Sequence, residues 1–194
     1  LNRDNIKTSY AGTYVDPSVN LNSESYWNKK LSPSSSSEWK GAPIQIDNFT
    51  LTHRRQGFPC GDYQIQVVNN DDVTEIRIDD VLIFTRTYST GSVLVEDGKT
   101  YSLNKNSRVE IRLREDAGDA NVNVKFIPVE TIYNGTGNAP TGLTAITISG
   151  NTTLQSDIEV CSCTIKAGAT LIIPADKTLT VNENITAAAG GKLL

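Results

Sequence analysis

The sequence predicts an all-β protein, an antiparallel β-sandwich followed by the start of a parallel β-helix or similar β-repeat. Its apolar residues are mostly Val, Ile, Leu, Tyr and Phe, interleaved with Thr, Asn, Ser and Asp, a mixture typical of strands and turns. Long apolar patterns of helical period are missing. After Tyr133 the aromatic residues vanish and short apolar pairs recur about every 20 residues, which is typical of a coiled repeat.

The change of pattern near Tyr133 predicts the domain boundaries. The segment YNGTGNAPTGL is rich in Gly, Asn and Pro, which favours a linker. We therefore expect a sandwich over residues 1–132, a linker over 133–143 and a repeat segment over 144–194. Because so few coils cannot bury their own faces, we expect the chain to be one piece of a longer repeat-bearing surface protein.

Several short strands with turn signals between them predict the sandwich. Apolar and polar residues alternate from Ile65 to Val67 and again from Ile76 to Ile78, which is the period of a half-buried strand. Between them, residues 69–72 are expected to form a four-residue tip, and the Asp79-Asp80 pair a hairpin turn. The expected strands cover residues 10–15, 44–52, 62–69, 74–79, 81–86, 92–95, 108–114 and 121–127.

The C-terminal repeat has a period of roughly 20 residues. Two glycine-containing corners, at Gly168 and Gly190, are expected at matching positions. The expected pairs are Ile158 with Leu179, Val160 with Val181, Ile165 with Ile185 and Leu171 with Leu193. An irregular second sandwich is the alternative.

Composition excludes several classes of function. The net charge of -4 argues against a nucleic-acid partner, which needs a basic face. No apolar run approaches the length of a membrane-spanning helix, so we expect a chain that does not cross the membrane. The only histidine, His53, has no nucleophile or acid partner at a fixed spacing, so we expect no enzyme.

The three cysteines do not form a zinc pattern, because Cys161 and Cys163 are separated by one residue and no second pair exists. Cys60 can pair with either of them, and the sequence does not decide which. The polar, Asn- and Thr-rich composition favours an extracellular location, where such a disulfide persists.

The tip at residues 69–72 places hard oxygen ligands side by side, as calcium requires. Asp71 and Asp72 repel each other unless a cation or a hydrogen-bond network offsets the repulsion. A second acidic loop contains Asp116 and Asp119. The competing interpretation is that both loops are turns held by side-chain hydrogen bonds, which Asn and Asp form routinely.

Several motifs of residues 8–130 occur together in a recognisable order. They are Tyr10-Ala-Gly-x-Tyr14, Trp39-Lys-Gly41, His53-Arg-Arg-Gln-Gly-Phe-Pro-Cys-Gly-x-Tyr63, Asn69-Asn-Asp-Asp72, Ile76-x-Ile-Asp79 and Val109-Glu-Ile-Arg-Leu-Arg-Glu115-x-x-Gly118. This order resembles the protective-antigen-type β-sandwich module, in the variant found in secreted surface adhesins of gliding Bacteroidetes. The C-terminal coils resemble repeats that follow such modules in type IX-secreted proteins.

The resemblance implies a binding function. In sugar-binding members, an Asp-Asp pair joined by a cis peptide bond holds a calcium ion, which coordinates glycan hydroxyls. The resemblance places Asp71 and Asp72 in that role. It adds Asn70, Asp116 and Asp119 as further candidate metal ligands. Candidate ligand-binding residues are Asn69 beside the pair, Tyr88 through ring stacking, and Arg54 and Arg55 through bidentate contacts to acids or a structural ion pair.

We therefore expect a secreted, adhesin-like binding module on a bacterial cell surface, with calcium as cofactor. Its expected partner is an extracellular glycan or another surface protein. The runner-up is a non-catalytic structural or protein-docking module of a long surface filament. A glycoside hydrolase is the third hypothesis, because paired carboxylates can also hydrolyse glycosides.

Overall fold

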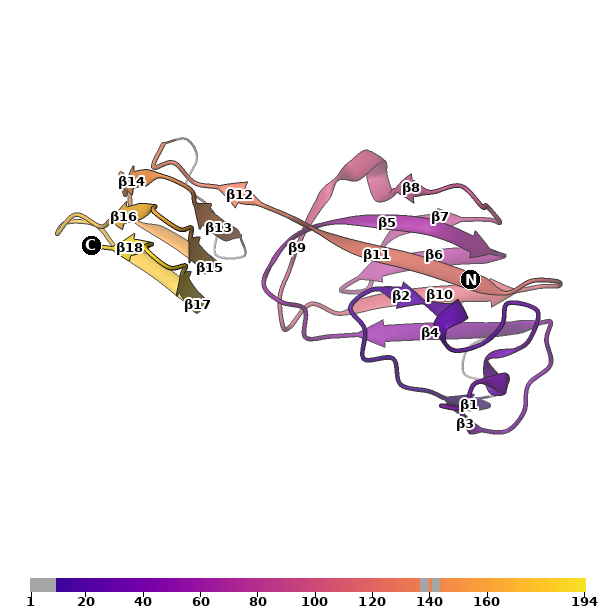
Figure 1. Ribbon diagram of the computed structural model, residues 1–194. Helices are drawn as coiled ribbons and strands as arrows, with labels where there is room; N and C mark the ends of the chain where they lie inside the picture. Colours follow the sequence, from indigo (N-terminus) through magenta and orange to yellow (C-terminus); the bar gives the residue numbers. More distant parts are fainter. Residues whose placement is uncertain (1–9, 137–139, 141–143) are drawn as a thin grey trace. The chain divides into compact units, whose positions relative to one another are not determined.

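The computed structural model describes residues 10–136, 140 and 144–194 and confirms the all-β class (Figure 1). Among these residues the only helical turns are short 3-10 segments, at Ser23–Ser25, Pro33–Ser35 and Val95–Gly98. The described part contains no helix long and apolar enough to span a membrane. The chain divides into two compact units. The first comprises residues 1–56, 64–99 and 107–127, and the second comprises residues 57–63, 100–106 and 128–194.

The first unit is built on two antiparallel sheets. One sheet has the order β4 (Phe49–Arg55), β10 (Val109–Glu115), β6 (Val73–Ile78) and β7 (Val81–Arg86). The other has the order β2 (Leu21–Asn22), β11 (Asn121–Val129), β5 (Gly61–Asp71) and β8 (Val93–Leu94). β5 also pairs with β9 (Thr100–Leu103), which belongs to the second unit, as do the first residues of β5. A separate ribbon joins β1 (Gly12–Thr13) to β3 (Lys40–Gly41).

The sandwich core follows the alternation seen in the sequence. Ile65 and Val67 of β5 are fully buried, as are Ile76 of β6 and Leu113 of β10. Burial of such side chains contributes about 1.5–3 kcal/mol each. Most of the expected strands are present, but residues 10–15 contain only the two-residue β1, and β4 begins at Phe49, within the expected strand 44–52.

The turn regions differ from the prediction in one important place. The predicted four-residue tip is wrong, because β5 continues through Asp71 and β6 begins at Val73. The two strands belong to different sheets, so Asp72 is the only residue of a sharp crossing between the sheets. The hairpin at Asp79 and Asp80 is confirmed, since both residues have positive φ and β6 pairs with β7 on either side.

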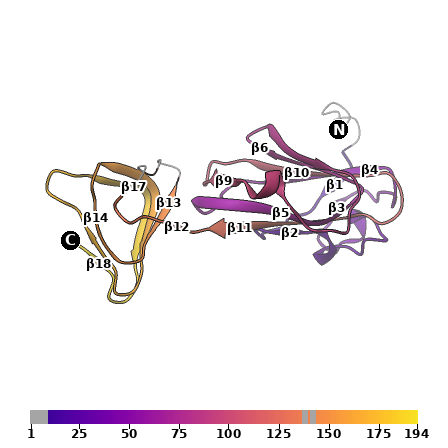
Figure 2. The same cartoon turned by 90° about the horizontal axis from the view of Figure 1, so that it is seen from above.

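The second unit is a stack of parallel coils (Figure 2). One sheet contains β12 (Thr131–Ile132), β13 (Ala145–Ile148), β15 (Ile158–Ile165) and β17 (Leu179–Ala187). The other contains β14 (Asn151–Thr153), β16 (Thr170–Ile172) and β18 (Lys192–Leu193). Of the predicted linker 133–143, residues 137–139 and 141–143 lie outside the described part.

The predicted repeat register is confirmed at three of its pairs and wrong at one. Ile158 pairs with Leu179, Val160 with Val181 and Leu171 with Leu193. Ile165, however, pairs with Ala187, and Cys163 takes Ile185 as its partner. The register shifts after Val160, where β17 carries an additional residue, so the later pairs are displaced.

The coils enclose their own apolar core. Ile148, Val160, Cys163, Ile165 and Leu171 are fully buried in it. A disulfide joins Cys60 to Cys161, with 6.0 Å between the Cα atoms, and Cys163 stays a free, buried thiol. The disulfide therefore fixes the segment 57–63 to the coil strand β15 inside the second unit.

Candidate functional site

Two connections between the sheets of the first unit meet at one place. The first is the crossing from β5 to β6 at Asp71 and Asp72, and the second is the loop from β10 to β11 at residues 116–120. The peptide bond between Asp71 and Asp72 is cis. The backbone N–H of Asp116 donates to Oδ2 of Asp72 at 2.8 Å, so the two connections are joined directly.

Asp72 and Asp47 hold the second loop in place. Oδ2 of Asp72 also lies 3.4 Å from the backbone nitrogen of Ala117, and Oδ1 of Asp47 accepts from the N–H of Gly118 at 3.0 Å. These carboxylates satisfy backbone donors of a tight turn, a common role of Asp. Asp72 therefore organises the loop with at least one of its oxygens.

Asp71 instead lines a small cavity of about 90 Å³ in the first unit. The cavity is bounded by residues from the crossing, from the second loop and from the segment after Ser23. Its oxygen-bearing side chains include Asn69, Asp71, Asp119 and Asn121.

Two residues that line this cavity have a buried amide oxygen without a partner among the described residues. Oδ1 of Asn69 and Oδ1 of Asn121 accept no hydrogen bond from any described residue. Asn121 is 8% exposed, so its amide oxygen is removed from bulk water. An unpaired buried acceptor costs about 1–3 kcal/mol, so such groups are normally paired with protein, water or an ion.

The neighbouring amide, Asn70, is fully used by the protein. Its nitrogen donates to the carbonyls of Asp72 and Thr87 at 2.7 and 3.0 Å, and its oxygen accepts from Nε of Arg86 at 2.7 Å. Asn70 is 1% exposed and also pairs through its backbone with Ser89. It therefore fixes the crossing to the loop that carries Tyr88.

The acidic groups of the cavity influence each other. Burial, a side-chain hydrogen bond with Asp72 and the charges of Asp72 and Asp119 raise the pKa of Asp71 to about 6. A raised pKa of this kind means that the surroundings of Asp71 disfavour its ionised carboxylate. A cation placed in the cavity would offset that cost.

The donor set is mixed. In residues 10–136, 140 and 144–194, no three His, Cys, Asp or Glu side chains come close enough together to hold a metal ion. The residues that line the cavity instead combine the carboxylates of Asp71, Asp119 and the exposed Glu24 with the amides of Asn69 and Asn121. Calcium accepts all of these oxygen types and binds six to eight of them, while waters or a ligand complete the set.

The other predicted site residues lie elsewhere or at the rim. Asp116 pairs with Arg114, with 2.7 Å between Oδ2 and Nη2, and does not line the small cavity. Tyr88 does line it and is 58% exposed. Arg54 pairs with Glu110 at 2.8 Å and Arg55 donates to the carbonyl of Ser18 at 2.6 Å, both outside the small cavity.

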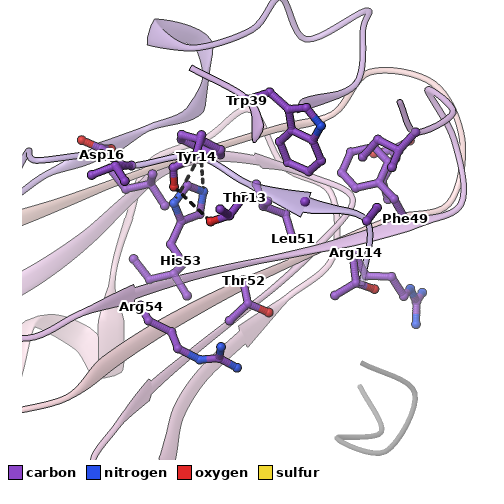
Figure 3. A pocket seen from close by; sticks show the side chains of 18 of the residues that line it. Thr13, Tyr14, Asp16, Trp39, Phe49, Leu51, Thr52, His53, Arg54 and Arg114 are labelled. Atoms are coloured by element: carbon purple, nitrogen blue, oxygen red, sulfur yellow. Dashed lines mark hydrogen bonds between the residues drawn. The ribbon is translucent and has the colours of Figure 1, made fainter. Parts of the chain in front are cut away.

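A larger cavity of about 1140 Å³ runs along β4 (Figure 3). Tyr14, Phe49, Leu51 and His53 face it, and Trp39 closes one side in the close view. The hydroxyl of Tyr14 lies 2.9 Å from Nε2 of His53, and burial lowers the pKa of His53 to about 4. The imidazole is therefore neutral at pH 7 and takes part in packing the N-terminal segment against β4.

Glu115 is a buried acid next to the candidate site that sequence reasoning did not single out. It takes the next inward position of β10 after Leu113, it is 1% exposed, and neither carboxylate oxygen has a partner among the described residues. Burial, followed by the charges of Asp72, Asp71, Asp47 and Asp116, raises its pKa to about 8. The alternation of buried and less buried positions along β10 could have indicated from the sequence that Glu115 points inward.

The raised pKa of Glu115 predicts a pH-dependent stability in the metal-free protein. The folded state holds this proton between the ordinary value of 4.5 and about 8, so stability falls as pH rises through that window. Glu115→Gln imitates the protonated form and should raise the free energy of unfolding at pH 8.5 by about 1–3 kcal/mol, with little effect at pH 4.5. Urea denaturation in the presence of a chelator measures the free energy of unfolding, and Glu183→Gln, at an exposed position, is the control. An equal gain in this free energy at pH 8.5 and pH 4.5 would contradict the prediction.

Comparison with protein-family models, curated proteins and solved structures gives no match. The structure itself establishes an all-β chain with an antiparallel sandwich and a parallel β region.

Proposed function

We propose that the first unit is a calcium-dependent binding module of a secreted surface protein, and that its ligand is an extracellular glycan. The observation that carries the proposal is the pair of buried, unpartnered amide oxygens of Asn69 and Asn121, two residues that line the same cavity as Asp71 and Asp119. Calcium binds carboxylate and amide oxygens alike, so a cation can be coordinated directly by this set of side chains.

The arrangement leaves room for a ligand. Four side-chain oxygens are fewer than the six to eight that calcium takes, so the remaining positions belong to backbone carbonyls, waters or ligand hydroxyls. Neighbouring hydroxyls of a sugar are neutral oxygen donors of the kind that can replace waters on calcium. The exposed ring of Tyr88 stands at the rim of the same cavity and offers an apolar face for a pyranose.

The disulfide supports an extracellular location, since disulfides persist in oxidising compartments and are rare in the cytosol. A purely structural module is the second candidate. A specific observation favours it, because Asp72 and Asp47 already satisfy backbone donors of the second loop and so explain part of the acidic cluster without a metal. A purely structural role does not explain why the amide oxygens of Asn69 and Asn121 are buried without a hydrogen-bond partner among the described residues.

A glycan microarray distinguishes the two candidates. The proposal predicts binding in millimolar calcium, loss of binding in a chelator, and loss in Asp119→Asn. The exposed Asp176→Asn, in the second unit, is the matched control and should bind like the wild type. Binding that is indifferent to calcium, or no binding to any glycan by a calcium-loaded protein, would reject the glycan-binding hypothesis.

A further inference from the structure

The small cavity already contains a positive charge from the protein itself. Nζ of Lys29 lies 2.8 Å from Oδ2 of Asp119, and both residues line the cavity. The ammonium therefore contacts Asp119 directly, in the same cavity that Asp71 lines.

The backbone holds Lys29 at this place. Its carbonyl accepts from the N–H of Ala120 at 2.7 Å, which fixes it to the residue between Asp119 and Asn121. Trp27, two residues earlier, is 3% exposed and anchors the same segment in the first unit. Within this segment Ser23 Oγ also accepts from the N–H of Val122 at 2.9 Å. The backbone of Lys29 is therefore hydrogen-bonded to the loop that carries Asp119.

An ammonium group and a calcium ion both bind acceptor oxygen atoms. Lysine carries three N–H donors and no acceptor, so it can satisfy only acceptor oxygens, and the cavity provides these from Asp71, Asp119, Asn69 and Asn121. A metal that binds Oδ2 of Asp119 must separate it from Nζ of Lys29, because two cations at a few ångströms repel each other.

We propose that Lys29 is a tethered counter-cation that competes with the metal for this oxygen cluster and sets its calcium affinity. The inference rests on the proposed function and deepens it. In the metal-free protein Lys29 offsets the repulsion between Asp71 and Asp119; in the metal-bound protein it is released towards solvent, where 44% of its side chain is already exposed. Competition of this kind favours weak calcium binding, in the range of about 10⁻⁴–10⁻³ M that extracellular modules use.

The test compares Lys29→Gln with Lys30→Gln by calcium titration calorimetry and thermal unfolding. Lys30 is the next residue, exposed and not part of the cavity lining, so the two variants change the net charge equally. Lys29→Gln should bind calcium about two- to fivefold more tightly than the wild type, the change that loss of a solvent-exposed ion pair brings. Without calcium the same variant should unfold at a lower temperature, and calcium should raise that temperature more than in the wild type.

The outcomes separate the two claims. Tighter binding in Lys29→Gln alone supports the counter-cation. Equal affinities in the wild type and both variants overturn it while leaving the calcium site in place, as does an equal gain in both variants, which would report net charge only. Absence of calcium binding in all three proteins overturns the counter-cation and the proposed function together.

Discussion

Replacing Cys60 and Cys161 by serine is expected to lower the free energy of unfolding of the second unit by about 2–5 kcal/mol. The bond connects residues 101 positions apart, so its loss frees a long loop in the unfolded chain. It also releases the segment 57–63, whose Phe58 is 1% exposed and whose Pro59 carbonyl accepts from the hydroxyl of Tyr63 at 2.8 Å. Hydrogen exchange across β13 and β15 should therefore rise.

Hydrogen exchange measured by mass spectrometry resolves the effect unit by unit. Cys163→Ala is the control, because it removes a buried thiol and leaves the disulfide intact. It should cost less than the double serine variant. If the peptides of β15 exchange at the wild-type rate in the double variant, the disulfide does not stabilise the coils as we expect.

Asn121→Ala is expected to weaken calcium binding by about tenfold or more, which corresponds to about 1.4 kcal/mol. Asn121 lines the cavity, and the variant removes its buried amide oxygen, which accepts no hydrogen bond from a described residue. For the same reason it should cost the metal-free fold little, since no such bond to Oδ1 is lost and an unsatisfied buried acceptor disappears.

This combination separates a metal ligand from a structural asparagine. Asn121→Asp, which keeps an oxygen at the position and adds negative charge, should bind calcium at least as tightly as the wild type. Calcium calorimetry and urea denaturation in a chelator together measure both effects. A large loss of metal-free stability in Asn121→Ala with unchanged calcium affinity would assign the residue to the fold.

The strands of the sandwich could be predicted because their side chains alternate, as Ile65 and Val67 do in β5. The crossing at Asp72 could not, because period-two patterns do not reveal which sheet a strand joins. The sequence predicted a four-residue tip between β5 and β6, yet the two strands belong to different sheets and only Asp72 separates them.

The sequence identified acidic residues of the candidate site but not their arrangement. Both acidic loops were recognisable, but which of Asp116 and Asp119 faces the cavity depends on how the second loop turns. Asp72 fixes that turn by accepting a hydrogen bond from the N–H of Asp116. In this arrangement the carboxylate of Asp116 forms an ion pair with Arg114, and Asp119 lines the cavity. Lys29 gave no signal, because it lies far away in sequence and no motif marks it.

The coils show the same limit. Their period was visible, and it placed Leu179 and Leu193 correctly. One additional residue in β17 places Ile185 opposite Cys163 and not opposite Ile165. Apolar spacing alone does not reveal this shift, because Cys163 and Ile165 are both apolar. The partner of Cys60 was open for a similar reason, because Cys161 and Cys163 are close in sequence; the structure pairs Cys60 with Cys161 and leaves Cys163 free.

Calcium titration calorimetry on the wild type and on the double variant Asp71→Asn/Asp119→Asn tests the central claim most directly. The account predicts one calcium ion per chain, with a dissociation constant of about a millimolar or tighter, and no binding in the double variant when its fold is intact by circular dichroism. Absence of binding by the wild type at millimolar calcium, or an unchanged isotherm in the double variant, would contradict it.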